Sequence, residues 1–234
     1  MKALILDLDD TLYNQEEPFK RAVQAYLPVQ DGQMEDLYIA FRLHADEVFE
    51  AATAGEMSLE ASHIYRMKRS LADFGYIVSD EQALTIQKDY QEYQGQLLLS
   101  PEFPEIFAYC RQRQICLGVI TNGPHLHQLR KVESLNLTRW IPEEHILISG
   151  QLGVTKPAKV IFDLMAEKVQ VLPEEMCYVG DSFESDIVGA KRAGWQAIWL
   201  NHRRRKEPQS PYRADAVVEQ REDLFGKIKK LDAR

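Results

Sequence analysis

The sequence is poor in cysteine and has no long apolar run. Its three cysteines are an odd number without a CxxC pair, which argues against a disulfide scaffold and favours reduced thiols. No apolar stretch approaches the roughly 20 residues that cross a bilayer, and the run after Lys2 breaks at Asp7. We therefore expect no signal peptide, no membrane partner and a cytoplasmic protein.

Histidine motifs and an overall basic charge are also missing. The six histidines form no HExxH or HxxxH pattern, so we expect no zinc site. The net charge is −8, and residues 15–97, with 15 acidic and 7 basic side chains, account for all of it. Such a surface repels a phosphate backbone, which excludes a nucleic-acid polymer as the expected partner. We interpret the basic run HRRRK (202–206) as a solvated loop.

The composition is that of a globular protein. The chain has 234 residues, of which 45% are hydrophobic and 27% charged. Five short apolar runs predict strands, at 2–9, 116–122, 145–150, 176–181 and 197–201. Helical patterns between them begin at Pro104, His125, Ala158 and Asp186. This alternation predicts an α/β fold with a doubly wound, mostly parallel sheet.

Strand signals vanish between residues 15 and 97. Four amphipathic helical runs replace them, at 18–27, 35–52, 59–75 and 81–94. Ser58 fits a helix N-cap, and Ser79 with Gln82 fits a capping box. We expect an inserted helical domain at 15–97, and an α/β domain made from 1–14 and 98–234.

Polar residues, together with two glycines, gather where the predicted strands end, which is where an open parallel sheet binds ligands. They are Asp7, Asp9, Thr11, Thr121, Asn122, Gly123, Lys156, Gly180, Asp181 and Asp186. Each alone has an ordinary explanation as a cap or a turn residue. Together the four carboxylates repel one another, and Mg²⁺ suits a site made of a few carboxylates, waters and phosphate oxygens. Mg²⁺ is therefore the expected cofactor.

This pattern resembles the haloacid dehalogenase (HAD) superfamily. The matching segments are DLDDT (7–11), ITNG (120–123), TKP (155–157) and GDSFESD (180–186). The resemblance implies a Rossmann-like catalytic core and a helical, C1-type cap at 15–97. It further implies a phosphatase, monomeric or homodimeric, that hydrolyses a small phosphorylated metabolite such as a nucleoside monophosphate or sugar phosphate. The reaction would pass through an aspartyl-phosphate.

The resemblance also implies roles for single residues. Asp7 would be the nucleophile and Asp9 the general acid and base. The phosphoryl group would bind to Thr121, Asn122, Gly123 and Lys156, and the metal to Asp7, the Asp9 carbonyl, Asp181 and Asp186. Asp10 has no role in this scheme and is expected to be a solvated turn residue. Candidate cap contacts are Lys20, Arg21, Arg42, His44, Tyr13, Phe19, Phe41 and Phe49.

Two alternatives stay open. A 2-haloacid dehalogenase releases a halide, which needs no proton donor, and such enzymes typically lack the second aspartate that Asp9 provides here. A receiver domain or a phosphate-binding protein without turnover also gathers acids, a threonine and a lysine around Mg²⁺. Receiver domains, however, are much shorter and have no insertion after the first strand.

Overall fold

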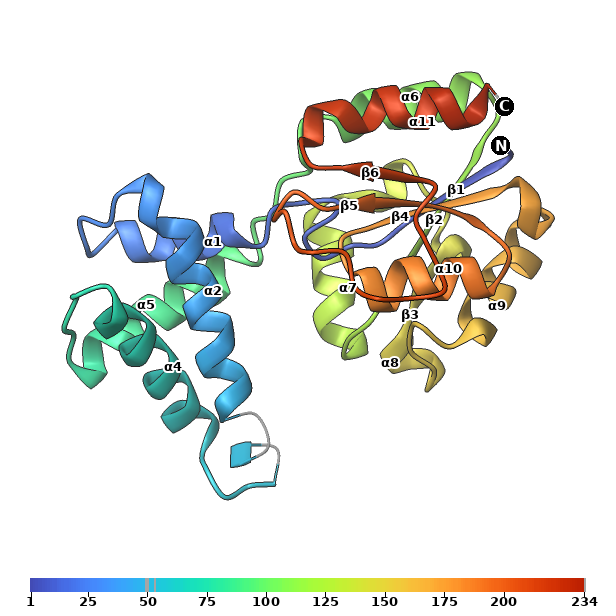
Figure 1. Ribbon diagram of the computed structural model, residues 1–234. Coiled ribbons are helices and arrows are strands. Elements are labelled where there is room, and N and C mark those ends of the chain that lie inside the picture. The colour runs from blue at the N-terminus through green and yellow to red at the C-terminus, as the bar shows by residue number, and fades with distance from the viewer. Residues whose placement is uncertain (49–50, 53, 234) are drawn as a thin grey trace. The chain divides into compact units, whose positions relative to one another are not determined.

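The computed structural model describes residues 1–48, 51–52 and 54–233 (Figure 1). The chain forms two compact units, Met1–Asn14 with Leu98–Arg234, and Gln15–Leu97. No helix among the described residues is both long enough and apolar enough to cross a membrane. The two units are described separately below.

The first unit is built on a six-stranded parallel sheet with the order β3-β2-β1-β4-β5-β6. Its strands are β1 (Ala3–Leu6), β2 (Cys116–Thr121), β3 (Ile146–Ile148), β4 (Met176–Gly180), β5 (Gln196–Leu200) and β6 (Ala216–Val218). The doubly wound parallel fold is therefore confirmed. Strand order runs outward in opposite directions from β1 and β4, so the switch point lies between these two central strands.

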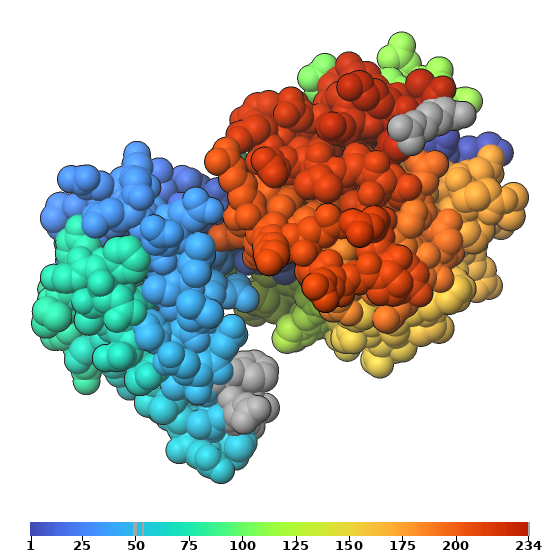
Figure 2. All heavy atoms as spheres, viewed as in Figure 1, coloured from blue at the N-terminus to red at the C-terminus, as the bar shows by residue number. Residues whose placement is uncertain are grey.

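Helices cover both faces of this sheet (Figure 1). They are α6 (Phe103–Gln112), α7 (His125–Ser134), α8 (Ser149–Leu152), α9 (Lys159–Val169), α10 (Gly189–Arg192) and α11 (Leu224–Asp232). One face packs on α9 and α10, where Phe162, Met165 and Trp195 are buried against the strands. The segment from β5 to α11 forms much of the surface of this unit on the face shown in Figure 2.

Several element boundaries differ from the predicted ones. The third strand ends at Ile148 because Ser149 begins α8. The helix predicted from Asp186 starts earlier, as a π-helical turn at Phe183–Val188, and continues as α10. The short edge strand β6 was not predicted, since three residues carry too little periodicity to stand out. The nine-residue helix α11 was not predicted either.

The second unit contains α1 (Glu16–Gln24), α2 (Asp31–Glu47), α4 (Leu59–Asp73) and α5 (Asp80–Tyr93). Ser58 accepts a hydrogen bond from the Ala61 N–H, and Ser79 and Gln82 form the reciprocal capping box, so both predicted helix starts are confirmed. The Phe19 and Phe41 rings pack at a tilt of 34° in the buried core of this unit, so they hold helices together and are not exposed to a substrate. Phe49 lies outside the described residues.

Candidate active site

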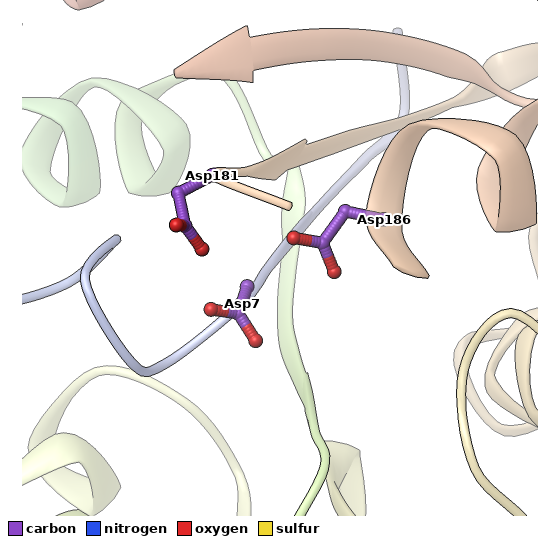
Figure 3. Close-up of side chains that lie close together, drawn as sticks. All are labelled: Asp7, Asp181 and Asp186. Atoms are coloured by element: carbon purple, nitrogen blue, oxygen red, sulfur yellow. The ribbon is translucent and has the colours of Figure 1, made fainter. Parts of the chain in front are cut away.

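Three carboxylates converge at the carboxyl end of the sheet (Figure 3). Asp7 follows β1, Asp181 follows β4, and Asp186 lies in the π-helical turn. One carboxylate oxygen from each lies within 4.8 Å of the other two. The grouping arises because β1 pairs with β4 and the Asp7 N–H donates to the Val179 carbonyl at 2.9 Å.

Gly180 makes room for this cluster. A Cβ atom at that position would lie 2.2 Å from Asp186 Oδ2, so only glycine lets the Asp186 carboxylate turn back over the strand end. The carboxylate is held there by the Ser182 N–H, which donates to Asp186 Oδ2 at 3.0 Å. Ser182 in turn caps the turn through its Oγ, which accepts from the Ser185 N–H.

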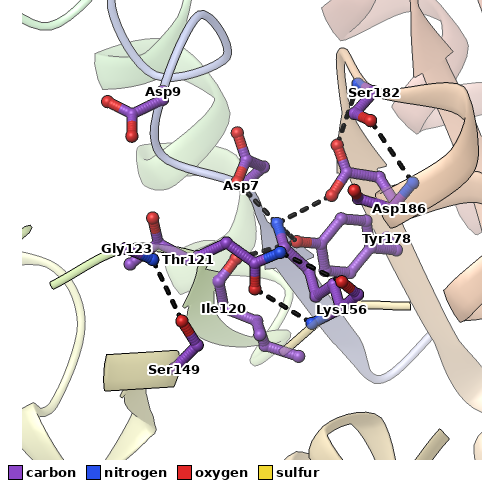
Figure 4. A network of polar contacts seen from close by, with 12 residues as sticks. Asp7, Asp9, Ile120, Thr121, Gly123, Ser149, Lys156, Tyr178, Ser182 and Asp186 are labelled. Atoms are coloured by element: carbon purple, nitrogen blue, oxygen red, sulfur yellow. Dashed lines mark hydrogen bonds and ion pairs between the residues drawn. The ribbon is translucent and has the colours of Figure 1, made fainter. Parts of the chain in front are cut away.

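Lys156 is buried among these acids (Figure 4). Its Nζ donates to Asp7 Oδ1 at 2.6 Å, to Asp186 Oδ1 at 2.7 Å and to the Tyr178 hydroxyl at 2.8 Å. Burial alone lowers the pKa of Lys156, but the charges of Asp186 and Asp7 outweigh it and raise the pKa well above the usual value. The ammonium group therefore stays charged in the interior.

Asn122 positions this lysine. Its side-chain Oδ1 accepts from the Lys156 N–H at 2.9 Å, and its Nδ2 donates to the Lys156 carbonyl at 3.0 Å. The Asn122 side chain is thus fixed against the backbone of Lys156 by two hydrogen bonds, and it links the loop after β2 to the segment that carries Lys156.

Asp9 points away from Lys156 and belongs to a different network (Figure 4). It accepts from Lys131 Nζ at 2.6 Å, from Gln128 Nε2 at 2.7 Å and from the Tyr13 hydroxyl at 2.5 Å. Burial by itself raises the pKa of Asp9, but the Lys131 ion pair and these hydrogen bonds outweigh it and lower the pKa. Asp9 is therefore held as a carboxylate.

The remaining predicted phosphoryl ligands lie beside this network. Thr121 is buried, and its Oγ1 is hydrogen-bonded to Gln128 Nε2. The Gly123 N–H donates to Ser149 Oγ at 3.0 Å. Gly123 has a φ of 145°, a conformation that side chains rarely adopt, so glycine is required for this turn.

Comparison with known proteins identifies the family. The sequence model of the haloacid dehalogenase-like hydrolases matches residues 1–194. The chain belongs to this family. It is therefore a hydrolytic enzyme, as the motifs predicted.

This HAD-like hydrolase is similar to several phosphatases. A phosphoserine phosphatase from Thermus thermophilus is 28% identical, over 88% of this chain and 91% of the relative. A glyceraldehyde 3-phosphate phosphatase from Methanopyrus kandleri is 27% identical, over 85% of this chain and 83% of the relative.

Solved structures share its fold. The HAD-hydrolase YfnB of Bacillus subtilis, bound to magnesium, superposes with a TM-score of 0.64 at 22% identity, over 97% of this chain and 98% of that one. The L-2-haloacid dehalogenase of Xanthobacter autotrophicus gives a TM-score of 0.63 at 18% identity, over 98% and 99% of the two chains. Identities this low show the common fold alone.

The prediction for Asp10 in this HAD-like hydrolase was wrong. Asp10 is buried, with a φ of 61°, and its Oδ2 accepts from Arg203 Nε at 2.6 Å and lies 3.3 Å from His202 Nε2. Arg221 donates to the Asp10 and Thr11 carbonyls at 2.6 and 2.8 Å. Burial raises the pKa of Asp10, but His202 and Arg203 outweigh it and lower the pKa.

The interpretation of HRRRK as a solvated loop was therefore wrong at its first two residues. His202 and Arg203 are mostly buried against Asp10, and Arg205 Nη1 lies 3.6 Å from Asp181 Oδ2. These contacts anchor the loop after β1, which carries Asp7 and Asp9, to the loop after β5. The basic residues neutralise the acidic end of the sheet from within the same unit.

Sequence reasoning also missed Gln128 and Lys131. Both lie on α7, three residues apart, and both are buried with Val132 on the inner face of that helix. The sequence offered one signal for them, because both fall on the buried stripe of an amphipathic helix. Polar residues in that position need polar partners inside the protein. Their partner Asp9 is more than a hundred residues earlier in the chain.

Proposed function

We propose that the chain is a Mg²⁺-dependent phosphomonoester hydrolase that acts on a small phosphorylated metabolite through an aspartyl-phosphate. The observation that carries this proposal is the buried cluster of Asp7, Asp181 and Asp186 with Lys156 in contact. Its phosphatase relatives support the reaction class. Residues 1–14 and 98–234 are proposed as the catalytic core, and residues 15–97 as a cap that supplies substrate contacts.

The donor set of the cluster fits Mg²⁺. It consists only of carboxylate oxygens, the ligands that this hard cation prefers. Three carboxylates face the ammonium of Lys156 and the more distant guanidinium of Arg205, so the cluster keeps a net negative charge that a divalent ion would balance. Burial, and after it the charges of Asp186 and Asp10, raise the pKa of Asp181 to about 7, although Arg205 and Lys156 oppose the rise. Asp7, the Asp9 carbonyl, Asp181 and Asp186 would hold the ion.

Asp7 is the proposed nucleophile. When bound, Mg²⁺ offsets the repulsion between this carboxylate and the anionic phosphate. A carboxylate oxygen of Asp7 attacks phosphorus, an O–P bond forms, and the bond from phosphorus to the leaving oxygen breaks. Lys156 Nζ fixes the Asp7 carboxylate through a hydrogen bond of 2.6 Å and so limits the motion of that carboxylate before attack.

Asp9 is the proposed proton-transfer group. As a carboxylate it first takes up a proton from solvent when the substrate binds, gives that proton to the leaving oxygen in the first step, and takes a proton from the attacking water in the second. The contact with Lys131 favours its carboxylate form, which is the form that accepts the water proton. The hydroxyl of Thr121, the main-chain amides of Asn122 and Gly123, and the N-terminus of α7 are proposed to bind the phosphoryl oxygens.

Phosphate release tests this function directly. We expect release from a generic aryl phosphate in millimolar Mg²⁺, and none in EDTA. A metabolite panel that includes nucleoside monophosphates and sugar phosphates then identifies the substrate. Halide release from 2-haloacids, without phosphate release from any panel member, would instead establish the dehalogenase alternative.

Metal binding should depend on pH through Asp181. In the metal-free protein its pKa is about 7, above the roughly 3.9 of an unfolded chain. The stabilising contribution of its neutral form is thus full below about pH 4 and is lost as the pH rises through 7. Mg²⁺ needs the ionised form, so the rise in Tm on adding Mg²⁺ should be several degrees larger at pH 8 than at pH 6.

Thermal unfolding in Mg²⁺ and in EDTA at both pH values measures this difference. The Asp181→Asn variant is the control, because it cannot titrate at this position and should show a smaller pH dependence of the Mg²⁺ effect than the wild type; Asp7, whose pKa is also raised, still titrates in this variant. An equal rise in Tm at pH 6 and pH 8 for the wild type would contradict the assignment.

Asp9→Asn should lower kcat by about 10²-fold or more, because general acid–base groups contribute 10²–10⁴-fold. Mg²⁺ affinity should stay nearly unchanged, since only the backbone carbonyl of Asp9 is proposed as a ligand. Phosphate release and Mg²⁺ titration calorimetry measure the two effects. A large loss of metal affinity would show that the Asp9 side chain is itself a ligand.

A further inference from the structure

None of the four arginines in residues 15–97 has a carboxylate within ion-pair distance among the described residues, and the positive charges of two of them, Arg42 and Arg66, act on each other. Arg42 lies on α2 and Arg66 on α4. Burial lowers the pKa of the Arg66 guanidinium, and the neighbouring positive charge of Arg42 lowers it further. Like charges that act on each other in this way repel, and a bound anion would relieve the repulsion.

This lack of partners is not caused by a shortage of acids. Residues 15–97 hold 15 acidic and only 7 basic side chains. Lys20 and Lys68, in the same unit, pair with Asp31 and Asp80 at 3.0 and 2.5 Å. These two lysines are half-buried, whereas the exposed Lys88 and the four arginines form no such ion pair among the described residues. Arg42 and Arg66 differ from the other unpaired cations because the positive charge of one acts on the other.

Neutral groups hold the two arginines. Arg66 Nη2 donates to Gln87 Oε1 at 3.0 Å, and Arg42 Nη1 donates to Gln15 Oε1 at 3.3 Å. The Arg66 guanidinium also stacks over the Phe41 ring, with its Cζ 4.7 Å from the ring centroid. This contact fixes the orientation of the guanidinium group. These neutral contacts form no ion pair. Burial lowers the pKa of Arg42, but Tyr38 and, among the smaller causes, the charge of Asp46 outweigh burial and raise the pKa.

Hydrogen-bond donors at this cluster lack acceptors. Gln87 is 2% exposed, yet its Nε2 has no hydrogen-bond partner, and neither has Arg66 Nε. Buried donors without acceptors cost free energy, and native proteins rarely keep them. Arg42 is exposed and Arg66 half-buried, so a small solute can reach the guanidinium groups.

The three helices that carry the cluster belong to one unit. α2 packs on α4, and α4 packs on α5, which contributes Gln87 (Figure 1). Arginine forks and an amide NH₂ are all donors, so the complementary ligand is an oxyanion, which a guanidinium binds through two parallel hydrogen bonds.

We propose that Arg42, Arg66 and Gln87 form a binding site for a carboxylate or phosphate group, and that this group is a second anionic group of the substrate. Its assignment to the substrate rests on the proposed function, in which residues 15–97 act as the cap. The oxyanion site itself depends only on the contacts within residues 15–97.

Phosphoserine and phosphoethanolamine test the assignment, because they differ by one carboxylate. We expect the wild type to favour phosphoserine in kcat/KM by about 10-fold to 100-fold, the range for a charge-assisted hydrogen bond. Arg66→Gln and Arg42→Gln should each bring this ratio close to one, because they lower kcat/KM for phosphoserine much more than for phosphoethanolamine. Arg69→Gln, which removes an exposed arginine from the same helix, should keep the wild-type ratio.

Succinate binding to the protein in EDTA tests the site without catalysis. Calorimetry should show binding to the wild type, Asp7→Asn and Arg69→Gln, and at least tenfold weaker binding to Arg66→Gln and Arg42→Gln. Arg66→Gln removes the packing of the guanidinium on Phe41 and could destabilise the fold. Arg42 is exposed, so Arg42→Gln should fold in either case.

The outcomes separate the two proposals. Absence of aryl phosphate hydrolysis overturns the proposed function, while succinate binding still decides the oxyanion site. A ratio near one in an active wild type that binds succinate overturns the assignment to the substrate and leaves a site for a free anion. Equal succinate affinity in all variants, or none in the wild type, overturns the site.

Discussion

Asp7→Asn should abolish phosphate release, with a loss in kcat of at least about 10³-fold, because removal of a nucleophile costs most of an enzyme's rate enhancement. The amide nitrogen and oxygen of asparagine cannot form the aspartyl-phosphate that the proposed mechanism requires. Asparagine has nearly the same shape and keeps an acceptor for Lys156 Nζ. The loss should therefore reflect chemistry and not misfolding.

Stability measurements make this test sharper. Burial raises the pKa of Asp7 well above its usual value, and Asp186 and Asp181 raise it further, although Lys156 opposes them. An ionised Asp7 is thus unfavourable in the metal-free protein, and a neutral asparagine removes the repulsion. In EDTA at pH 8 we expect Asp7→Asn to unfold at the same temperature as the wild type or higher.

Asp163→Asn is the matched control for this variant. Asp163 is on the surface of α9 in an ion pair with Lys159, so the same chemical change there should leave activity unchanged and alter stability only slightly. Retention of near wild-type phosphate release by Asp7→Asn would exclude Asp7 as the nucleophile.

Lys156→Met should destabilise the metal-free protein by about 3–5 kcal/mol, the usual cost of breaking a buried ion pair. Among the described residues, Lys156 is the only cation in ion-pair contact with Asp7 or Asp186. Without it two buried carboxylates face each other. The loss in free energy of unfolding should be smaller at pH 5, because the raised pKa of Asp7 lets that carboxyl group take up a proton.

Urea unfolding of the wild type, Lys156→Met, Asp7→Asn and the double variant measures this effect. The double variant should be less destabilised than Lys156→Met alone, because Asp7→Asn removes one of the unpaired charges. Mg²⁺ should restore part of the stability of Lys156→Met. A loss below about 1 kcal/mol at pH 8 would mean that the buried cluster is neutral without the lysine, contrary to the proposed charge balance.

The cluster of Asp7, Asp181 and Asp186 could be predicted because strand ends are encoded locally. The apolar run before Asp7 and the run before Asp181 each form a strand from their own residues. Parallel pairing then brings their carboxyl ends to the same edge of the sheet. Asp7, Asp181 and Asp186 meet as this rule requires, although most of the chain separates the first from the others.

Short or irregular elements could not be predicted in the same way. β6 has three residues and pairs only with β5, so its conformation depends on an edge that is formed by the rest of the sheet. The π-helical turn before α10 forms where Gly180 lets Asp186 fold back, a packing constraint that periodicity does not contain.

The amino-acid sequence by itself determined the α/β alternation, the helical insertion and the acidic motifs, since each depends on neighbouring residues along the chain. Only the tertiary structure decided which charges meet. Asp9 pairs with Lys131, Asp10 with Arg203, and Arg42 and Arg66 are left without a carboxylate in the described part of their unit. A charged side chain has many candidate partners in a sequence, and packing selects among them by distance and by exclusion of water.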